Sequence, residues 1–365
     1  MSSGYIGNFR YIIPNNVIYI NVKIRDTSTT TKGNDMKKHA LLSSAIVLAL
    51  MASTASAAEQ IRILAPTWLG FAPVHIAQDL GCFTKQDLDV SIRFEDDLTN
   101  VMAAMERGDI EMQMRSVGEY QGRPRDKSTP GVIIGTIDES VGGDGVIADA
   151  SISSVADLKG KTVAAEANIP SRLLLQMELK KAGLTLNDLQ IKEIATADTG
   201  SVFADSSISA VATYEPFMSQ AISAGVRDGA KILISSKDHR GLIIDAIIVR
   251  NDDLKAAPAK YGKFLECIYE AVDFIKAEPD KFAEMASKHF GLTPKEVLDI
   301  ANGSLSYTSL AEAKDYMGAP GAPGTLFDIF ATVMDLNLEN GAADNRLVAS
   351  EQIDNSVIAA LNAKN

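Results

Sequence analysis

The stretch that decides the fold class is residues 61–81, which read IRILAPTWLGFAPVHIAQDLG. Its first five residues are mostly aliphatic and β-branched, and they predict a strand over Ile61–Ala65. Pro73 then opens a helical pattern that ends at Gly81, because proline suits the first turn of a helix and glycine the position after the last. A strand, a loop that carries Trp68 and a helix make the first half of a β–α unit.

The same alternation continues along the chain and predicts α/β layers with mostly parallel strands. Further strands are predicted at 90–94, 132–137, 146–148, 162–165, 190–194, 210–213, 231–235 and 242–249. Helical patterns lie between several of them, including 100–107 and a pattern that Ser171 can cap and Gly183 ends. After Asn251 the chain is predicted to be helical almost to its end, with interruptions at Pro279, Pro294 and residues 318–324.

A secretory signal peptide is predicted over residues 36–57. Met36 is followed by Lys37 and Lys38, then by a short apolar run and by the small-residue sequence Ala55-Ser56-Ala57. This order of basic, apolar and small residues is typical of export with cleavage after Ala57, and the run is too short to span a bilayer. We therefore interpret Met36 as the translation start and residues 1–35 as an upstream extension. No cysteine follows the apolar run, so we expect no lipid anchor.

The charge balance excludes several classes of protein. Lys and Arg total 35 against 47 Asp and Glu, which gives a formal charge of −12 over 365 residues. Removal of residues 1–57 takes away six basic and two acidic side chains, so the exported chain carries −16. Net acidity repels phosphate backbones and disfavours nucleic-acid binding. We also expect no metal and no cofactor, because His75 has no second ligand at metal spacing and no phosphate-binding fingerprint is present.

A series of short motifs, taken in order, resembles a family of transport proteins. They are Trp68 to Pro73 with Gly81-Cys82-Phe83, Gly143 to Ala148, Val155 to Lys161, Leu173-Leu174 with Ala182-Gly183-Leu184, Ala212 to Pro216, and Ser235-Ser236-Lys237. In this order they resemble the periplasmic solute-binding proteins of nitrate, sulfonate and taurine type ABC transporters, the NMT1/THI5-like family. Cys82 departs from the aromatic residue usual in the family at that position.

The resemblance implies an α/β, two-lobed periplasmic-binding-protein type II fold, each lobe a mostly parallel sheet flanked by helices, with two crossover strands. It places residues 58–147 in the first part of lobe I, 148–246 in lobe II and 247–365 in the completion of lobe I. The crossings are expected near 146–149 and 244–249. Both cysteines, Cys82 and Cys267, then fall in lobe I, where we expect buried thiols rather than a disulfide.

Candidate ligand-binding residues lie where strands end, because ligands of α/β proteins bind at the carboxyl ends of strands or between domains. The candidates are Trp68, Leu69, Phe71, Asp138, Ser140, Asp144, Glu166, Asn168, Ser171, Tyr214, Glu215 and Asp245. Each also has a structural interpretation: core packing for the apolar residues, helix capping for Ser171, turns for the loop carboxylates and an internal salt bridge for Asp245. The start of the helix at Ser171 would suit an anionic group, whereas several carboxylates around one pocket favour a cation.

The function predicted from these features is that of an extracytoplasmic solute-binding protein without catalytic residues. It would be a periplasmic monomer that delivers a small organic solute to an ABC permease with its ATPase. The family makes a sulfonate such as taurine the default solute, whereas the acidic strand ends favour an amine, an amidine or a zwitterion. Two alternatives stay open: an enzyme related to the yeast pyrimidine-precursor (thiamine) synthases, and a periplasmic sensor domain.

Overall fold

The computed structural model describes residues 6–13, 16–23 and 58–362. The predicted signal peptide, residues 36–57, lies outside the described residues. Strands β1 (Ile6–Ile13) and β2 (Asn16–Lys23) pair in antiparallel fashion. They belong to a compact unit, Met1–Ala57, that is separate from the unit Ala58–Asn365. The two lobes and the candidate site belong to the second unit.

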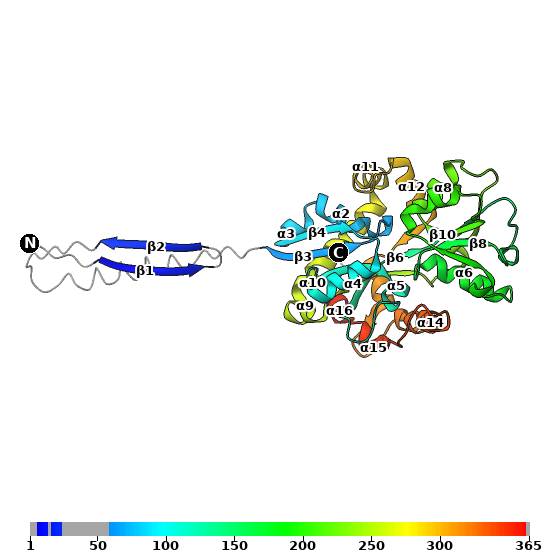
Figure 1. The fold of residues 1–365 in the computed structure, drawn as a ribbon. Coiled ribbons are helices and arrows are strands. Elements are labelled where there is room, and N and C mark those ends of the chain that lie inside the picture. The colour runs from blue at the N-terminus through cyan, green and yellow to red at the C-terminus, as the bar shows by residue number, and fades with distance from the viewer. Residues whose placement is uncertain (1–5, 14–15, 24–57, 363–365) are drawn as a thin grey trace, which may run out of the picture. The chain divides into compact units, whose positions relative to one another are not determined.

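Two sheets organise this unit (Figure 1). The larger sheet has the strand order β13-β6-β12-β5-β3-β4 and consists of β3 (Glu59–Ala65), β4 (Leu88–Phe94), β5 (Met112–Ser116), β6 (Val132–Ser140), β12 (Ile244–Val249) and β13 (Leu305–Tyr307). Strands β3 to β6 run in one direction, while β12 and β13 run in the other. We call this sheet with its helices the larger lobe.

The smaller lobe is built on the second sheet, whose order is β11-β7-β10-β8-β9. Its strands are β7 (Asp144–Ala148), β8 (Thr162–Ala165), β9 (Gln190–Glu193), β10 (Ala210–Tyr214) and β11 (Lys231–Ser235). Only β7 runs against the others. Because side chains alternate along a strand, Val146 and Ala148 pack into one apolar cluster and Ile147 into another on the opposite face.

Helices cover both lobes. In the larger lobe they are α2 (Ala72–Asp79), α3 (Cys82–Lys85), α4 (Leu98–Arg107), α5 (Val117–Gln121), α9 (Asn251–Ala256), α10 (Pro258–Ala277), α11 (Pro279–Phe290), α12 (Pro294–Gly303), α13 (Leu310–Met317), α14 (Thr325–Glu339), α15 (Ala349–Gln352) and α16 (Ser356–Ala360), with the short hairpin β14 (Gly318–Ala319) and β15 (Ala322–Pro323). In the smaller lobe they are α6 (Pro170–Lys181), α7 (Thr199–Ala204) and α8 (Phe217–Ser223). None of the helices among the described residues is long and apolar enough to span a bilayer.

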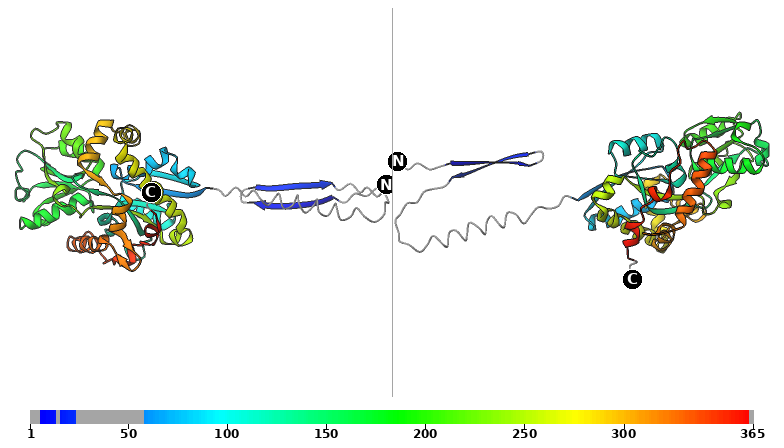
Figure 2. Two further views of the ribbon diagram at one scale, coloured as in Figure 1. Left: turned by 180° about the vertical axis from the view of Figure 1, so that it is seen from behind. Right: turned by 90° about the horizontal axis from the view of Figure 1, so that it is seen from below.

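The chain starts in the larger lobe, passes through the smaller lobe and returns. In Figures 1 and 2 the green segments form the smaller lobe, while the larger lobe combines the blue and cyan segments with the yellow to red ones. The chain leaves the larger sheet after Ser140 and returns at Ile244, so the exchanges fall at 141–143 and 236–243. They come before the positions expected from the sequence, because Asp144 and Gly145 already pair with β10 and β11. The two connecting segments are tied together by the hydroxyl groups of Ser140 and Ser236, 2.9 Å apart.

The expectation of two free thiols was wrong. Cys82 on α3 and Cys267 on α10 form a disulfide, with a Cα–Cα distance of 5.7 Å, across a sequence separation of 185 residues. The helix α10 belongs to the returning part of the chain and packs directly against α2 and α3. The bond therefore joins the first and last parts of the larger lobe, an association that spacing along the sequence does not reveal.

Candidate functional site

A small pocket lies between the two lobes, at the ends of strands from both sheets. We call it the inner pocket, and it is lined by Pro66, Trp68, Phe71, Glu119, Asp144, Pro170, Tyr214 and Asp245. Its volume is about 20 Å³, slightly above the 10–15 Å³ that one water molecule needs. Five predicted site residues, Trp68, Phe71, Asp144, Tyr214 and Asp245, line it.

The aromatic wall of the inner pocket is held by packing and hydrogen bonds. Trp68 and Tyr214 meet edge to face, with ring centroids 6.4 Å apart. The indole Nε1–H of Trp68 donates to Oδ1 of Asp138 at 3.2 Å. Two glycines make room for this arrangement: a Cβ at Gly143 would lie 2.2 Å from the Trp68 ring, and one at Gly70 would lie 2.1 Å from Oδ2 of Asp138. The group that comes closest to Gly143 is thus a side chain of the protein, Trp68.

Three aspartates, Asp138, Asp144 and Asp245, gather behind and beside this wall, and we call them the aspartate cluster. Asp138 on β6 and Asp245 on β12 are directly paired across the sheet, and the three side chains are 0%, 5% and 5% exposed. Burial raises the pKa of Asp138 and of Asp144 to about 7. Burial, together with the neighbouring Asp138, raises the pKa of Asp245 well above its usual range.

Hydrogen bonds to the aspartate cluster come from neutral groups. Asp144 accepts from the hydroxyl of Ser171 at 3.1 Å, and this hydroxyl also contacts the carbonyl oxygen of Thr213. Ser171 therefore does not cap its helix, which begins at Pro170 with Ile169 as the capping position and no side-chain cap. Among the described residues no donor reaches Oδ2 of Asp138, which is fully buried.

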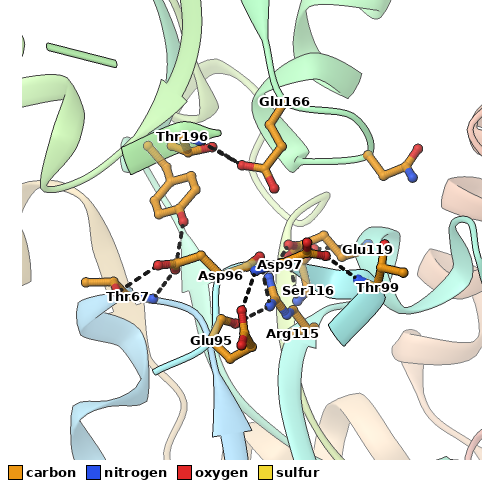
Figure 3. Close-up of polar contacts among 12 residues, drawn as sticks. Thr67, Glu95, Asp96, Asp97, Thr99, Arg115, Ser116, Glu119, Glu166 and Thr196 are labelled. Atoms are coloured by element: carbon orange, nitrogen blue, oxygen red, sulfur yellow. Dashed lines mark hydrogen bonds and ion pairs between the residues drawn. The ribbon is translucent and has the colours of Figure 1, made fainter. Parts of the chain in front are cut away.

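Polar residues of the larger lobe lie on another side of the inner pocket, and the sequence analysis did not predict them (Figure 3). Arg115 at the end of β5 is 2% exposed and donates to Glu119 at 3.1 Å and to the carbonyl oxygens of Glu95 and Asp96. Glu119 also accepts from Ser116, in a capping box that starts α5. The S-x-x-E pattern of Ser116 to Glu119 is a signal that could have revealed this helix start.

Several contacts join the two lobes around the pockets. The hydroxyl of Tyr214 lies 3.5 Å from Oδ1 of Asp96, which also accepts from the backbone N–H of Thr67. Farther out, Nδ2 of Asn168 donates to the carbonyl oxygen of Arg123 at 3.1 Å, and Lys180 on α6 pairs with Glu339 on α14. In this structure the two lobes therefore contact each other through polar side chains beside the pockets.

A second, larger pocket also has lining residues from both lobes, and we call it the outer pocket. Its volume is about 360 Å³, and Pro170 lines both pockets. The predicted residue Asn168 lines it in a left-handed conformation, φ 65°, which asparagine tolerates better than most residues. Arg123 and Arg172 line it as well, paired with Asp344 and Glu193.

Six of the predicted residues line neither pocket. Asp138 and Ser171 contact Trp68 and Asp144 as described above, and the other four have different partners. Glu215 accepts from the backbone N–H and the hydroxyl of Ser219 at the start of α8, and Glu166 accepts from the same two groups of Thr196 (Figure 3). Burial raises the pKa of both carboxyl groups. Leu69 is buried and its carbonyl oxygen accepts from Tyr307, while Ser140 contacts Ser236 as described above. The structure does not bring Glu215 to the pocket.

The arrangement of two sheets around a central site is the fold of the periplasmic binding proteins. The chain is similar to the periplasmic aliphatic sulphonate binding protein SsuA from Escherichia coli, with a TM-score of 0.67 and 17% identity over 84% of this chain and 95% of that one. It is also similar to the periplasmic nitrate-binding protein NrtA from Synechocystis PCC 6803, with a TM-score of 0.63 and 15% identity over 78% and 82% of the two chains. At these identities the similarity shows the fold alone.

The chain belongs to the NMT1/THI5-like family, whose model matches residues 68–282. A relative from Brucella abortus (strain 2308), named as a binding protein, is 25% identical over 282 residues, which are 75% of this chain and 85% of the relative. A protein of Escherichia coli (strain K12), named as an aliphatic sulfonates-binding protein, is 33% identical over 93 residues, 26% of this chain and 28% of that protein. The resemblance stated from the motifs is thereby confirmed.

Proposed function

We propose that this protein is an extracytoplasmic solute-binding protein of an ABC importer, which closes its lobes around a small organic solute and presents it to a permease. The observation that carries the proposal is the composition of the inner pocket. The larger lobe supplies Trp68, Phe71 and Asp245, and the smaller lobe supplies Asp144 and Tyr214. A pocket whose walls come from two lobes is complete only when the lobes close, and hinge closure is a common way to bind a ligand.

Export to the periplasm is part of the proposal. It is supported by the basic, apolar and small-residue order of residues 36–57 and by the disulfide between Cys82 and Cys267. Disulfides form and persist in oxidising compartments such as the periplasm, whereas cytosolic thiols are kept reduced. The expected mature chain begins at Ala58 and acts as a monomer.

Two other functions use the same fold. The enzyme alternative relied on a resemblance to synthases with a cysteine-rich motif, and here both cysteines of the chain are joined in a disulfide far from the pockets' lining residues. A sensor domain would bind a solute in the same way and deliver it to a receptor. Reconstitution with the permease encoded beside it separates the two, since only a transport protein stimulates solute uptake.

The test of lobe closure combines a ligand screen with solution scattering. Protein purified from the periplasm is screened by thermal shift against small sulfonates, carboxylates and amines, because a solute that binds only the folded state raises the melting temperature. The strongest compound is then added during small-angle scattering, and we expect the radius of gyration to fall. A compound that stabilises the protein at an unchanged radius of gyration would contradict closure.

A further inference from the structure

We infer that the inner pocket binds the protonated nitrogen of an organic cation, and that the carboxyl groups of the aspartate cluster supply the opposite charge. The inference rests on the proposed function, since it names the class of solute that the same cleft takes. Of the carboxylates predicted from the sequence it uses Asp138, Asp144 and Asp245 and leaves out Glu215, whose carboxylate accepts from Ser219.

The first argument is the charge balance of the buried carboxyl groups. Glu119 is paired with Arg115, and Glu139, the neighbour of Asp138, is paired with Arg240. Among residues 58–362 no lysine, arginine or histidine is ion-paired with Asp138, Asp144 or Asp245. Burial of unpaired carboxylates is costly, so the cluster must either hold protons or face a cation.

The second argument is an unsatisfied atom inside the cluster. Oδ2 of Asp138 is completely buried and no described donor reaches it. The Asp138 and Asp245 carboxyl groups lie within hydrogen-bonding reach of each other, a contact that requires a proton on one of them. Asp138 does not line the inner pocket, so Asp245, which does, is the member of this pair that a bound N–H donor would meet, and a cation there would take the place of the shared proton.

The third argument is the lack of donors for an anion at the pocket wall. The N–H of Trp68 already donates to Asp138, and the hydroxyl of Tyr214 lies beside the carboxylate of Asp96. A sulfonate in the inner pocket would lie beside Asp144 and Asp245 without those donors, and like charges at close range repel. The aromatic rings of Trp68 and Tyr214, by contrast, belong to the residue types that attract cations.

The sizes of the two pockets indicate the shape of the solute. About 20 Å³ accommodates one ammonium group or the end of an amidine, while the outer pocket, about 360 Å³, has room for the remainder of the molecule. Arg123 and Arg172 in the outer pocket are already paired with Asp344 and Glu193, so an acidic group at the far end of a zwitterion would compete with those carboxylates. The described residues contain no group of His, Cys, Asp and Glu side chains placed to hold a metal ion.

Protons and the cation compete for the same oxygens. The other charges near the cluster are those of Glu119, Glu139 and Glu215, of which the first two are paired with Arg115 and Arg240. Tyr214 and Tyr307 stay neutral, because burial raises the pKa of both well above the usual value. With the pKa of Asp138 and Asp144 at about 7, affinity for a cation should rise between pH 6 and pH 8, and affinity for a sulfonate should fall.

The test uses methylammonium, which fits a pocket for one ammonium group and stays protonated at these pH values. Thermal shift at pH 8 compares methylammonium chloride with sodium chloride, tetramethylammonium chloride and sodium methanesulfonate at equal ionic strength. We expect methylammonium to stabilise the wild type in a saturable way, and affinity to weaken tenfold or more in Asp245→Asn and Asp138→Asn. Asp89→Asn, an exposed carboxylate on β4, is the matched control and should retain wild-type affinity.

Each outcome separates this inference from the proposed function. Equal stabilisation by sodium or tetramethylammonium, an unchanged effect in Asp245→Asn, or stronger stabilisation by methanesulfonate would overturn the cation site. If a sulfonate then closes the lobes in solution scattering, the solute-binding function stands and only the class of solute changes. If methylammonium binds as expected but no solute closes the lobes, the cation site stands and the transport function fails.

Discussion

Buried charge in the core of the larger lobe and buried charge at the cleft between the lobes have different surroundings. In the core, Arg125 is 3% exposed and donates to the hydroxyl of Tyr120, to Gln352 and to the carbonyl oxygen of Gly131. Its guanidinium also lies 3.9 Å from the centre of the Tyr120 ring. At the cleft, the aspartate cluster is equally buried but leaves Oδ2 of Asp138 without a donor.

The difference shows how a structural charge is distinguished from a binding one. Arginine keeps its proton in proteins, so burial of Arg125 is tolerated only because oxygen acceptors and an aromatic ring surround it. An aspartate can be neutralised by a proton and released from it when a ligand arrives. Among the described residues, both regions contain one buried atom without a hydrogen-bond partner, Nε of Arg125 and Oδ2 of Asp138. The charge of Arg125 is nevertheless balanced by fixed acceptors of the protein, whereas we expect the charge of the aspartate cluster to be balanced by a proton or by what the cleft binds.

The largest expected effect is the loss of the core charge. Arg125→Met removes the guanidinium that donates to the carbonyl oxygen of Gly131 and to the amide oxygen of Gln352. The hydroxyl of Tyr120 has one proton and can then donate to only one of these two oxygens. We expect the free energy of unfolding to fall by about 3 kcal/mol or more, measured by urea denaturation. Methylammonium affinity of the folded variant should not change. A fall of less than about 1 kcal/mol in the free energy of unfolding would contradict a structural role for the charge of Arg125.

Removal of the disulfide tests whether the stability of the larger lobe can change without a change in binding at the cleft. Removal of the bond in a Cys82→Ser, Cys267→Ser double variant should lower the free energy of unfolding by about 2–4 kcal/mol, because the bond closes a long loop in the unfolded chain. Calorimetric affinity for the solute should stay at the wild-type value. A variant that keeps its stability but loses affinity would place the bond's effect at the cleft instead.

The smallest change in the free energy of unfolding is expected at the cleft, where the substitution should raise it rather than lower it. The pKa of Asp144 is raised from 3.8 to about 7 in the folded protein, so the unfolded chain loses its proton first and the fold loses stability as pH rises between these two values. Asp144→Asn removes that charge and should make the empty protein more stable than the wild type by about 1–2 kcal/mol at pH 8. The difference should vanish near pH 4, where the wild-type carboxyl group is protonated, and denaturation curves at both pH values measure it. A larger gain at pH 4 than at pH 8 would contradict the assignment.

Most strands were predictable because their apolar residues are close in sequence. Strands β3, β8 and β10 follow from runs of aliphatic residues, and α2 from a proline and a glycine at its ends. Strand β5 was missed because its sequence, MQMRS, contains Gln113 and Arg115, although all five residues are buried. Strand β13 has three residues and is paired only along the edge of β6, so its sequence contains no pattern long enough to detect.

At the candidate site, positions were easier to predict than partners. Trp68, Asp144 and Tyr214 follow or begin strands, and strand ends meet at the cleft in this class of fold. Glu215 also follows a strand, but the N–H and hydroxyl of Ser219, four residues later, bind its carboxylate. Glu119 was overlooked because its helix start depends on the missed strand β5.

The sequence by itself determined the secondary structure of most of the chain, the family and the surplus of acidic side chains, because these depend on local patterns and on composition. Which carboxyl groups are paired with a basic side chain depends on the tertiary structure. Glu139 meets Arg240 from 101 residues away, while Asp138, next to Glu139, points to the opposite face of β6 and meets Asp245. The pairing of Cys82 with Cys267 was decided in the same way. Such long-range partners are set by the packing of the two sheets and of α10, which no local pattern records.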